Sequence, residues 1–144
     1  MHPPPDNEVL ALRNVHQAYG ALQVVRGLSF GLARGAIGCL LGPSGCGKTT
    51  VLRCIAGFEA VRAGEIWLNG QLVSSAGTSV PPERRRVGMV FQDYALFPHL
   101  TVARNVAFGL HALPKSEQAR HAAECLDSVG LTGLGAKYPD QLSG

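Results

Sequence analysis

The chain has 144 residues, of which 46% are hydrophobic and 16% are charged, and its formal net charge is +3. This composition is typical of a folded domain with an apolar core and excludes a disordered chain. No stretch approaches the roughly 18 consecutive apolar residues of a transmembrane helix, and the basic excess is too small to indicate a nucleic-acid partner. The densest basic run, Arg84-Arg85-Arg86, is expected to be a solvated turn.

The first part of the chain favours strands. Residues 1–8 are expected to form a disordered tail, without the basic and apolar regions of a secretory signal. Residues 9–30 favour strands, with a turn at Tyr19 and Gly20. Residues 36–41 form a continuous apolar run between two glycines. Such a run is typical of a central strand of a parallel sheet, covered on both faces.

A helix and a hairpin follow this run. Residues 49–56 predict a helix that ends at Gly57, a glycine cap. Residues 64–73 predict a β-hairpin, because Asn69-Gly70 is the favoured pair for a two-residue turn with positive φ at both positions.

The pattern becomes helical after a last buried strand, which is expected at residues 87–91. Thr101 can cap a helix that runs to about residue 110. Ser116 can cap a second helix that runs to Val129, with Gly130 as its stop.

The four cysteines, Cys39, Cys46, Cys54 and Cys125, form no C-x-x-C pair and have no histidines at ligand spacing. A zinc site is therefore not expected. Cys39 and Cys54 fall in apolar patterns that are typical of small core residues. Such cysteine usage fits a reducing cytosolic compartment.

Between the apolar run and the first helix, the chain matches the phosphate-binding pattern G-x-x-x-x-G-K-[ST]. Glycines let the backbone approach phosphates closely, and successive N–H groups form an anion site with the positive end of the helix. Lys48 would reach the β- and γ-phosphates, and the Thr49 hydroxyl would ligate Mg²⁺. The pattern predicts that Mg·ATP is bound by Gly42, Pro43, Ser44, Gly45, Cys46, Gly47, Lys48, Thr49 and Thr50.

Further features resemble the ATP-binding subunits of ABC transporters, over residues 8–144. Tyr19 stands where that family has an aromatic residue that stacks on adenine. Residues 87–92 resemble the strand that leads into the family's Q-loop, at Gln92. The last three residues, Leu142-Ser143-Gly144, resemble the start of the LSGGQ signature. Each feature alone is weak, but their order and spacing around the phosphate loop indicate this family.

The resemblance implies roles for these residues. Tyr19 would stack on adenine, an interaction worth about 1–3 kcal/mol per base. Gln92 would bind Mg²⁺ or position the attacking water, and would thus join Lys48 as a catalytic residue. Ser143 and Gly144 would meet the γ-phosphate of ATP held by a second subunit, so the full-length protein is expected to be a homodimer.

The resemblance also implies an α/β fold. Residues 9–93 would form a P-loop NTPase core, a parallel sheet with helices, together with an antiparallel β subdomain. Residues 94–144 would form a partial helical subdomain that is truncated at the signature motif. In the family, the acidic strand that holds Mg²⁺, the catalytic glutamate and the switch histidine all follow that motif. We therefore expect the parent protein to be an ATPase and this chain to bind ATP with little or no hydrolysis.

The segment from Asp93 to Thr101 supports the transporter prediction. Tyr94, Leu96 and Phe97 are apolar residues in an expected surface loop. They either pack under the helical subdomain or, as the family implies, form part of the groove that receives a helix of the membrane permease. The protein would then be cytoplasmic and peripheral, on the inner face of the plasma membrane.

Residues 54–59 and 91–110 resemble importer ATPases for ferric iron, spermidine/putrescine, sulfate or sugars, and the ferric-iron importer most of all. Two alternatives belong to other classes. A GTPase or small-molecule kinase would explain the phosphate loop and a D-x-x-G match at residues 127–130, but that match ends a predicted helix and no N-K-x-D follows. A non-transport ABC ATPase would usually carry long insertions before the signature, and this chain is compact there. A simple nucleotide-binding fragment remains the third interpretation.

Overall fold

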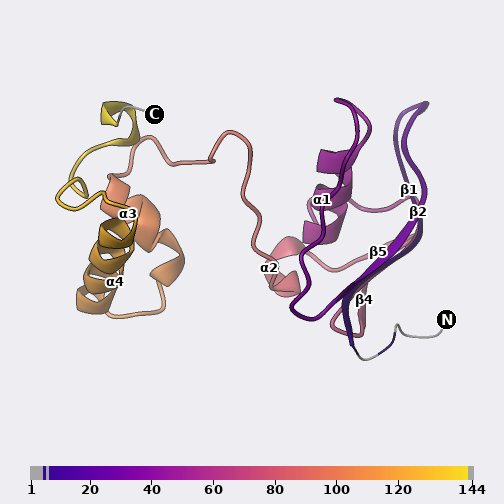
Figure 1. Cartoon of the computed structure of the whole chain (residues 1–144), viewed down its shortest axis with the longest axis horizontal. Helices are drawn as coiled ribbons and strands as arrows, with labels where there is room; N and C mark the ends of the chain where they lie inside the picture. Colours follow the sequence, from indigo (N-terminus) through magenta and orange to yellow (C-terminus); the bar gives the residue numbers. More distant parts are fainter. Residues whose placement is uncertain (1–4, 6, 143–144) are drawn as a thin grey trace. The chain divides into compact units, whose positions relative to one another are not determined.

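The computed structural model describes residue 5 and residues 7–142, which divide into two compact units (Figure 1). Unit 1 is Met1–Met89 and unit 2 is Val90–Gly144. Unit 1 contains a sheet, one helix of nine residues and a short helix of four residues, and unit 2 is helical. None of the helices among the described residues is long and apolar enough to cross a membrane.

The sheet of unit 1 is antiparallel throughout and has the order β2-β1-β3-β4-β5. Its strands are β1 (Glu8–Tyr19), β2 (Leu22–Ala33), β3 (Ala63–Leu68), β4 (Gln71–Ser75) and β5 (Thr78–Ser79). The expected strands in residues 9–30 are confirmed, and the turn between them contains Gly20 at φ 58°. The expected hairpin is β3–β4, in which Asn69 and Gly70 take positive φ values of 47° and 76°.

Helix α1 (Lys48–Ala56) packs against this sheet in unit 1. Its buried residues recur at helical spacing and are Thr50, Val51, Cys54, Ile55 and Ala56. They join strand residues such as Leu12, Val15 and Ile66 in one apolar core. The helix ends at Gly57, which has φ 94° and donates its N–H to the Arg53 carbonyl, so the predicted glycine cap is confirmed.

Arg85 corrects the expectation that residues 84–86 form a solvated turn. It ends the short helix α2 (Pro82–Arg85), and its side chain is only 4% exposed. The guanidinium donates to the Cys54 carbonyl at 2.7 Å and to the Ile55 carbonyl at 3.0 Å. The last carbonyls of a helix have no partner within the helix, so they accept hydrogen bonds from such a side chain.

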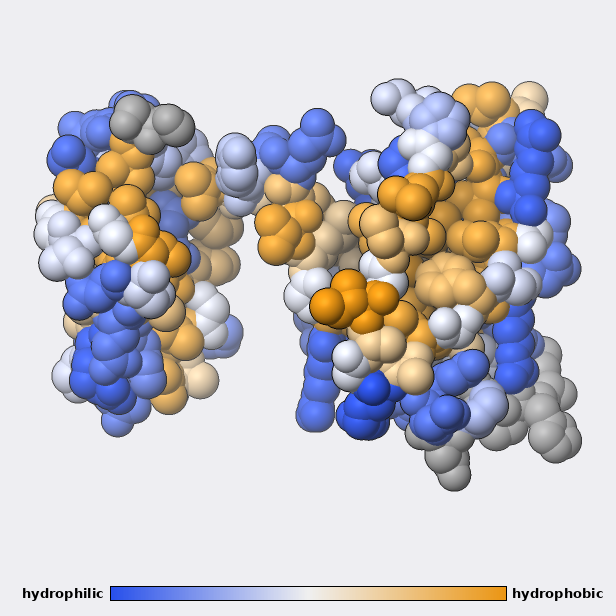
Figure 2. Space-filling view, in the orientation of Figure 1, coloured by the Kyte–Doolittle hydropathy of each residue, from blue (hydrophilic) through white to orange (hydrophobic). Residues whose placement is uncertain are grey.

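Two segments that were expected to be strands of a parallel sheet, residues 36–41 and 87–91, are not strands in the described chain. Ile37 is 98% exposed, Leu41 87% and Val90 91%, and Figure 2 shows apolar side chains lying open on the visible face of unit 1. A central strand requires a hydrogen-bonded neighbour on each side and cover on both faces. Within the described residues no strand pairs with either segment. The prediction that Cys39 is a core residue is also wrong, whereas that for Cys54 is confirmed.

Unit 2 contains α3 (Val102–Val106), the 3-10 turn η1 (Ala107–Leu110), α4 (Lys115–Ser128) and the 3-10 turn η2 (Pro139–Gln141). Thr101 caps α3 as predicted, because its side chain accepts a hydrogen bond from the Arg104 N–H. Helix α4 does not begin at a Ser116 cap. Its N-cap is Pro114, whose carbonyl accepts the Gln118 N–H, so Ser116 already lies within the first turn. The predicted stop is confirmed at Gly130, with φ 74°.

Candidate nucleotide-binding site

The phosphate loop of residues 42–49 leads directly into the N-terminus of α1. Three of its glycines, Gly42, Gly45 and Gly47, have φ values of 154°, 80° and 95°. Gly47 is buried, and a Cβ at this position would lie 2.9 Å from the Val24 carbonyl oxygen of β2. Only glycine tolerates both this conformation and this contact. The close approach places the start of α1, with its unpaired N–H groups, beside β2.

Lys48 is the first residue of α1, and its side chain folds back over the loop. Its Nζ donates to the Gly42 carbonyl at 2.7 Å and to the Pro43 carbonyl at 2.8 Å, and it lies 3.6 Å from the Cys46 Sγ. The ammonium group is therefore held over the backbone of the loop, where phosphate oxygens could replace the two neutral carbonyls as acceptors. Pro43 and Cys46 are exposed, as is Ser44.

Residues of the loop line a cleft of about 270 Å³ together with the end of β1. Its lining residues are Tyr19, Val24, Gly45, Gly47, Lys48, Thr49 and Thr50. Thr49 is exposed, which suits a hydroxyl that ligates a metal ion, whereas Thr50 is 8% exposed and belongs to the core. One face of unit 1 thus brings together the loop, the helix N-terminus and the predicted aromatic residue.

Tyr19 ends β1 and is 45% exposed. Its hydroxyl donates a 2.8 Å hydrogen bond to the Glu59 carboxylate, and the second Glu59 oxygen accepts from Gln17 Nε2 at 3.3 Å. Our sequence interpretation did not find Glu59 or Val24. Glu59 lies 40 residues from Tyr19, and no local pattern could have joined them.

The remaining predicted site residues, Gln92, Ser143 and Gly144, belong to unit 2. Gln92 is exposed in unit 2, so unit 1 by itself joins Tyr19 to the phosphate loop but does not include Gln92. Ser143 and Gly144 lie outside the described residues. The D-x-x-G match that favoured a GTPase is at the end of α4, where Asp127 accepts a hydrogen bond from the Thr132 hydroxyl.

Cys54 is not a candidate nucleophile. Its side chain is fully buried. Burial, followed by the Glu59 carboxylate, raises the pKa of the Cys54 thiol from 9.0 to about 11, although the Arg85 guanidinium opposes this. The thiolate is the reactive form, and at neutral pH Cys54 is a protonated core residue.

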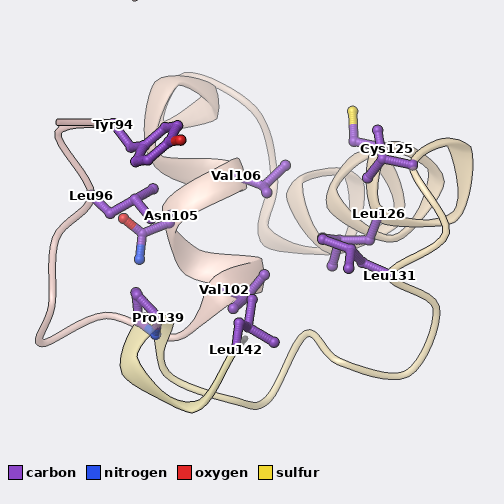
Figure 3. Close-up of a pocket in the computed structure, with 11 residues that line it drawn as sticks. Tyr94, Leu96, Val102, Asn105, Val106, Cys125, Leu126, Leu131, Pro139 and Leu142 are labelled. Carbon is purple, nitrogen blue, oxygen red and sulfur yellow. The ribbon is translucent and has the colours of Figure 1, made fainter. Parts of the chain in front are cut away.

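Unit 2 has an apolar cavity of about 580 Å³ between the segment after Gln92 and its two helices (Figure 3). The lining includes Tyr94, Leu96, Asn105, Leu126 and Leu142. Tyr94 is 79% exposed and Leu96 is 53% exposed, and both line the cavity.

Phe97, in contrast, packs on Phe108 with ring centroids 4.3 Å apart. The sequence offered two interpretations of this segment, packing under the helical subdomain or an open apolar surface, and different residues follow each of them. Phe97 packs within the helical unit, and Tyr94 and Leu96 offer open apolar surface.

A phosphate loop at a helix N-terminus, facing an aromatic residue across a cleft, defines a P-loop nucleotide-binding protein. The ABC transporter family model matches residues 25–144, and the chain belongs to the ABC transporter family. This confirms the resemblance that the motifs indicated and removes the GTPase alternative.

The chain is similar to import ATP-binding proteins. It is 48% identical to the spermidine/putrescine import protein PotA of Acidothermus cellulolyticus, over 98% of this chain and 37% of the relative. It is 42% identical to the Fe(3+) ions import protein FbpC of Pasteurella multocida, over 96% of this chain and 39% of the relative. It is 47% identical to the sulfate/thiosulfate import protein CysA 2 of Chromobacterium violaceum, over 96% of this chain and 37% of the relative. The chain thus spans well under half the length of these relatives.

Solved structures of ABC cassettes confirm the fold class. A post-hydrolysis dimer of the ATP-binding cassette MJ0796 with ADP and Pi matches with a TM-score of 0.80 and 25% identity. The match covers 93% of this chain and 63% of the MJ0796 chain. A second dimeric MJ0796 structure gives the same TM-score, at 26% identity.

Proposed function

We propose that this chain is the nucleotide-binding part of an ABC importer ATPase, which couples the binding and hydrolysis of Mg·ATP to solute uptake. The observation that supports this most is the cleft that joins the phosphate loop, the start of α1 and Tyr19. The import proteins to which the chain is similar agree with this function.

In this proposal the triphosphate replaces the two carbonyl acceptors of Lys48 and receives the first N–H groups of α1. The exposed Thr49 hydroxyl fits a ligand of Mg²⁺, because hard cations prefer oxygen donors. The ion would neutralise charge that develops on the phosphates. Tyr19 would stack on the adenine, and Gln92 would bind Mg²⁺ or position the attacking water.

A second subunit is part of the proposal. Ser143 and Gly144 would contact the γ-phosphate of the nucleotide on the partner, as in a homodimer of the full-length protein. Both MJ0796 structures are dimeric, which supports a dimer.

Membrane permease subunits would dock near residues 93–101, where Tyr94 and Leu96 leave apolar surface open. The protein would then be cytoplasmic and peripheral, on the inner face of the plasma membrane. In the parent protein, Tyr94→Glu puts a charge into this apolar surface and should abolish co-purification with the permease. Lys115→Glu changes an exposed residue of α4 and should not. Equal retention by both variants would contradict the docking site.

For the solute we propose ferric iron, on the resemblance of residues 54–59 and 91–110. Spermidine/putrescine and sulfate are the alternatives, since relatives of all three kinds are similar to this chain, and a sugar is the fourth. A strain that lacks the parent gene should fail to grow under iron limitation and recover with excess iron. Recovery with spermidine or sulfate alone would refute ferric iron.

The binding step is tested by titration of Mg·ATP into the wild-type chain and Lys48→Ala. Loss of charge-assisted hydrogen bonds to phosphate should weaken binding by about 10- to 100-fold. Lys115→Ala removes an exposed lysine outside the cleft and is the matched control. Unchanged affinity in Lys48→Ala, or a strong preference for GTP in the wild type, would refute the proposed site.

A further inference from the structure

Glu59 is attached to the last turn of α1 by its backbone. The N–H groups of Gly57, Phe58 and Glu59 all donate to the Arg53 carbonyl, at 2.9, 3.0 and 3.4 Å. Three donors on one helical carbonyl leave the segment little freedom, so the position of Glu59 follows that of the helix.

The Glu59 carboxylate also contacts β1 at two residues. One oxygen accepts from the Tyr19 hydroxyl at 2.8 Å, and the other accepts from Gln17 Nε2 at 3.3 Å. Residues two apart on a strand share a face. Hydrogen bonds to a charged acceptor are stronger than neutral ones, so this carboxylate fixes the ring of Tyr19 at the edge of the cleft.

We propose that Glu59 is a positioning residue for the nucleotide base, acting through Tyr19. The inference rests on the proposed binding of ATP with Tyr19 as the base platform. One end of α1 carries the phosphate loop, and the other end carries Glu59. A helix of nine residues has a length of ~14 Å. It therefore sets a fixed distance between the phosphates and the aromatic ring.

The benefit of this arrangement is preorganisation. Tyr19 is nearly half exposed, and without its hydroxyl contact the ring would rotate among several conformations. Ordering a free side chain on binding costs affinity. The carboxylate removes that cost before the nucleotide arrives.

The test compares two ligands, Mg·ATP and Mg·tripolyphosphate, which has phosphates but no base. Both are titrated into the 144-residue wild-type chain and into Tyr19→Phe, Glu59→Gln, Glu59→Ala and the double variant Tyr19→Phe/Glu59→Ala. Tyr19→Phe keeps the ring and removes only the hydroxyl. Glu83→Ala is the matched control, because it removes an exposed carboxylate on α2.

We expect Glu59→Ala to bind ATP about fivefold more weakly and tripolyphosphate with wild-type affinity, a loss within the net contribution of one typical hydrogen bond. Tyr19→Phe should show the same selective loss. The double variant should be no weaker than either single variant, because both remove one interaction. Glu59→Gln keeps an acceptor and should retain most of the ATP affinity.

The proposal is overturned if Glu59→Ala leaves ATP affinity unchanged, weakens both ligands equally, or adds its loss to that of Tyr19→Phe. Equal weakening would indicate a purely structural role. If Glu59→Ala does not fold, the test rests on the other two variants: Tyr19→Phe must lose ATP affinity selectively, and Glu59→Gln must retain most of it. A wild-type chain that binds ATP no better than tripolyphosphate refutes the base platform and the positioning role, and one that binds neither ligand refutes the proposed function itself.

Discussion

Replacement of Arg85 by methionine should destabilise unit 1 strongly. The guanidinium is buried and donates to the carbonyls of Cys54 at 2.7 Å, Ile55 at 3.0 Å and Val80 at 2.6 Å, and to the Ser79 hydroxyl at 2.8 Å. These bonds join the end of α1 to β5 and the segment that follows it. Methionine fills similar volume but donates none of them.

The size of the effect follows from the unpaired acceptors. A hydrogen bond to a charged group contributes about 1.5–3 kcal/mol, and each buried acceptor left without a donor costs about 1–3 kcal/mol. Relief from burying a cation offsets part of this loss. We expect the free energy of unfolding to fall by about 3–5 kcal/mol, because several buried acceptors lose their donor at once and the relief offsets only part of the loss.

Urea unfolding followed by tryptophan fluorescence measures this loss. Trp67 is the only tryptophan, is 8% exposed and lies in β3, so its signal reports on unit 1. Arg84→Met changes the exposed neighbour in α2 and should alter stability by less than about 0.5 kcal/mol. If Arg85→Met is no more destabilising than Arg84→Met, the hydrogen bonds of the buried guanidinium do not stabilise the unit.

Three further predictions concern the loop, a thiol and unit 2. Gly47→Ala should weaken Mg·ATP binding and destabilise unit 1 by about 1–3 kcal/mol, because the new Cβ would sit at positive φ and 2.9 Å from the Val24 carbonyl oxygen. Gly45→Ala is the control: there is open space around Gly45, so the loss of unfolding free energy in urea should be smaller. Alkylation of the exposed Cys46 with N-ethylmaleimide should block ATP binding by filling the loop, and C46S treated in the same way should still bind. The Asn105 side chain accepts from the Phe97 N–H and donates to the carbonyls of Phe97, Leu100 and Thr101. Asn105→Ala removes these four bonds, so amide exchange in residues 97–101 should accelerate about tenfold, the factor for about 1.4 kcal/mol of lost protection; an unchanged rate would contradict that role.

The residues of the phosphate loop and the ends of several elements follow from the sequence because their causes are local. The Asn69-Gly70 turn, the Gly57 cap and the Thr101 cap each depend on backbone conformations or short-range hydrogen bonds. The pattern from Gly42 to Thr49 likewise carries its chemistry in adjacent residues. Such features are visible without knowledge of the rest of the chain.

Tertiary structure decided the features that depend on distant partners. An apolar run predicts burial, but residues 36–41 lie largely exposed. A buried strand requires neighbouring strands to pair with, and the sequence of the run itself does not specify them. Arg85 resembled its exposed neighbours in sequence, yet the open carbonyls of α1 hold it in the core. The contact of Glu59 with Tyr19 exists only because the fold brings the end of α1 to the end of β1. Local chemistry thus set the phosphate-binding residues, and packing between distant segments set the geometry around them.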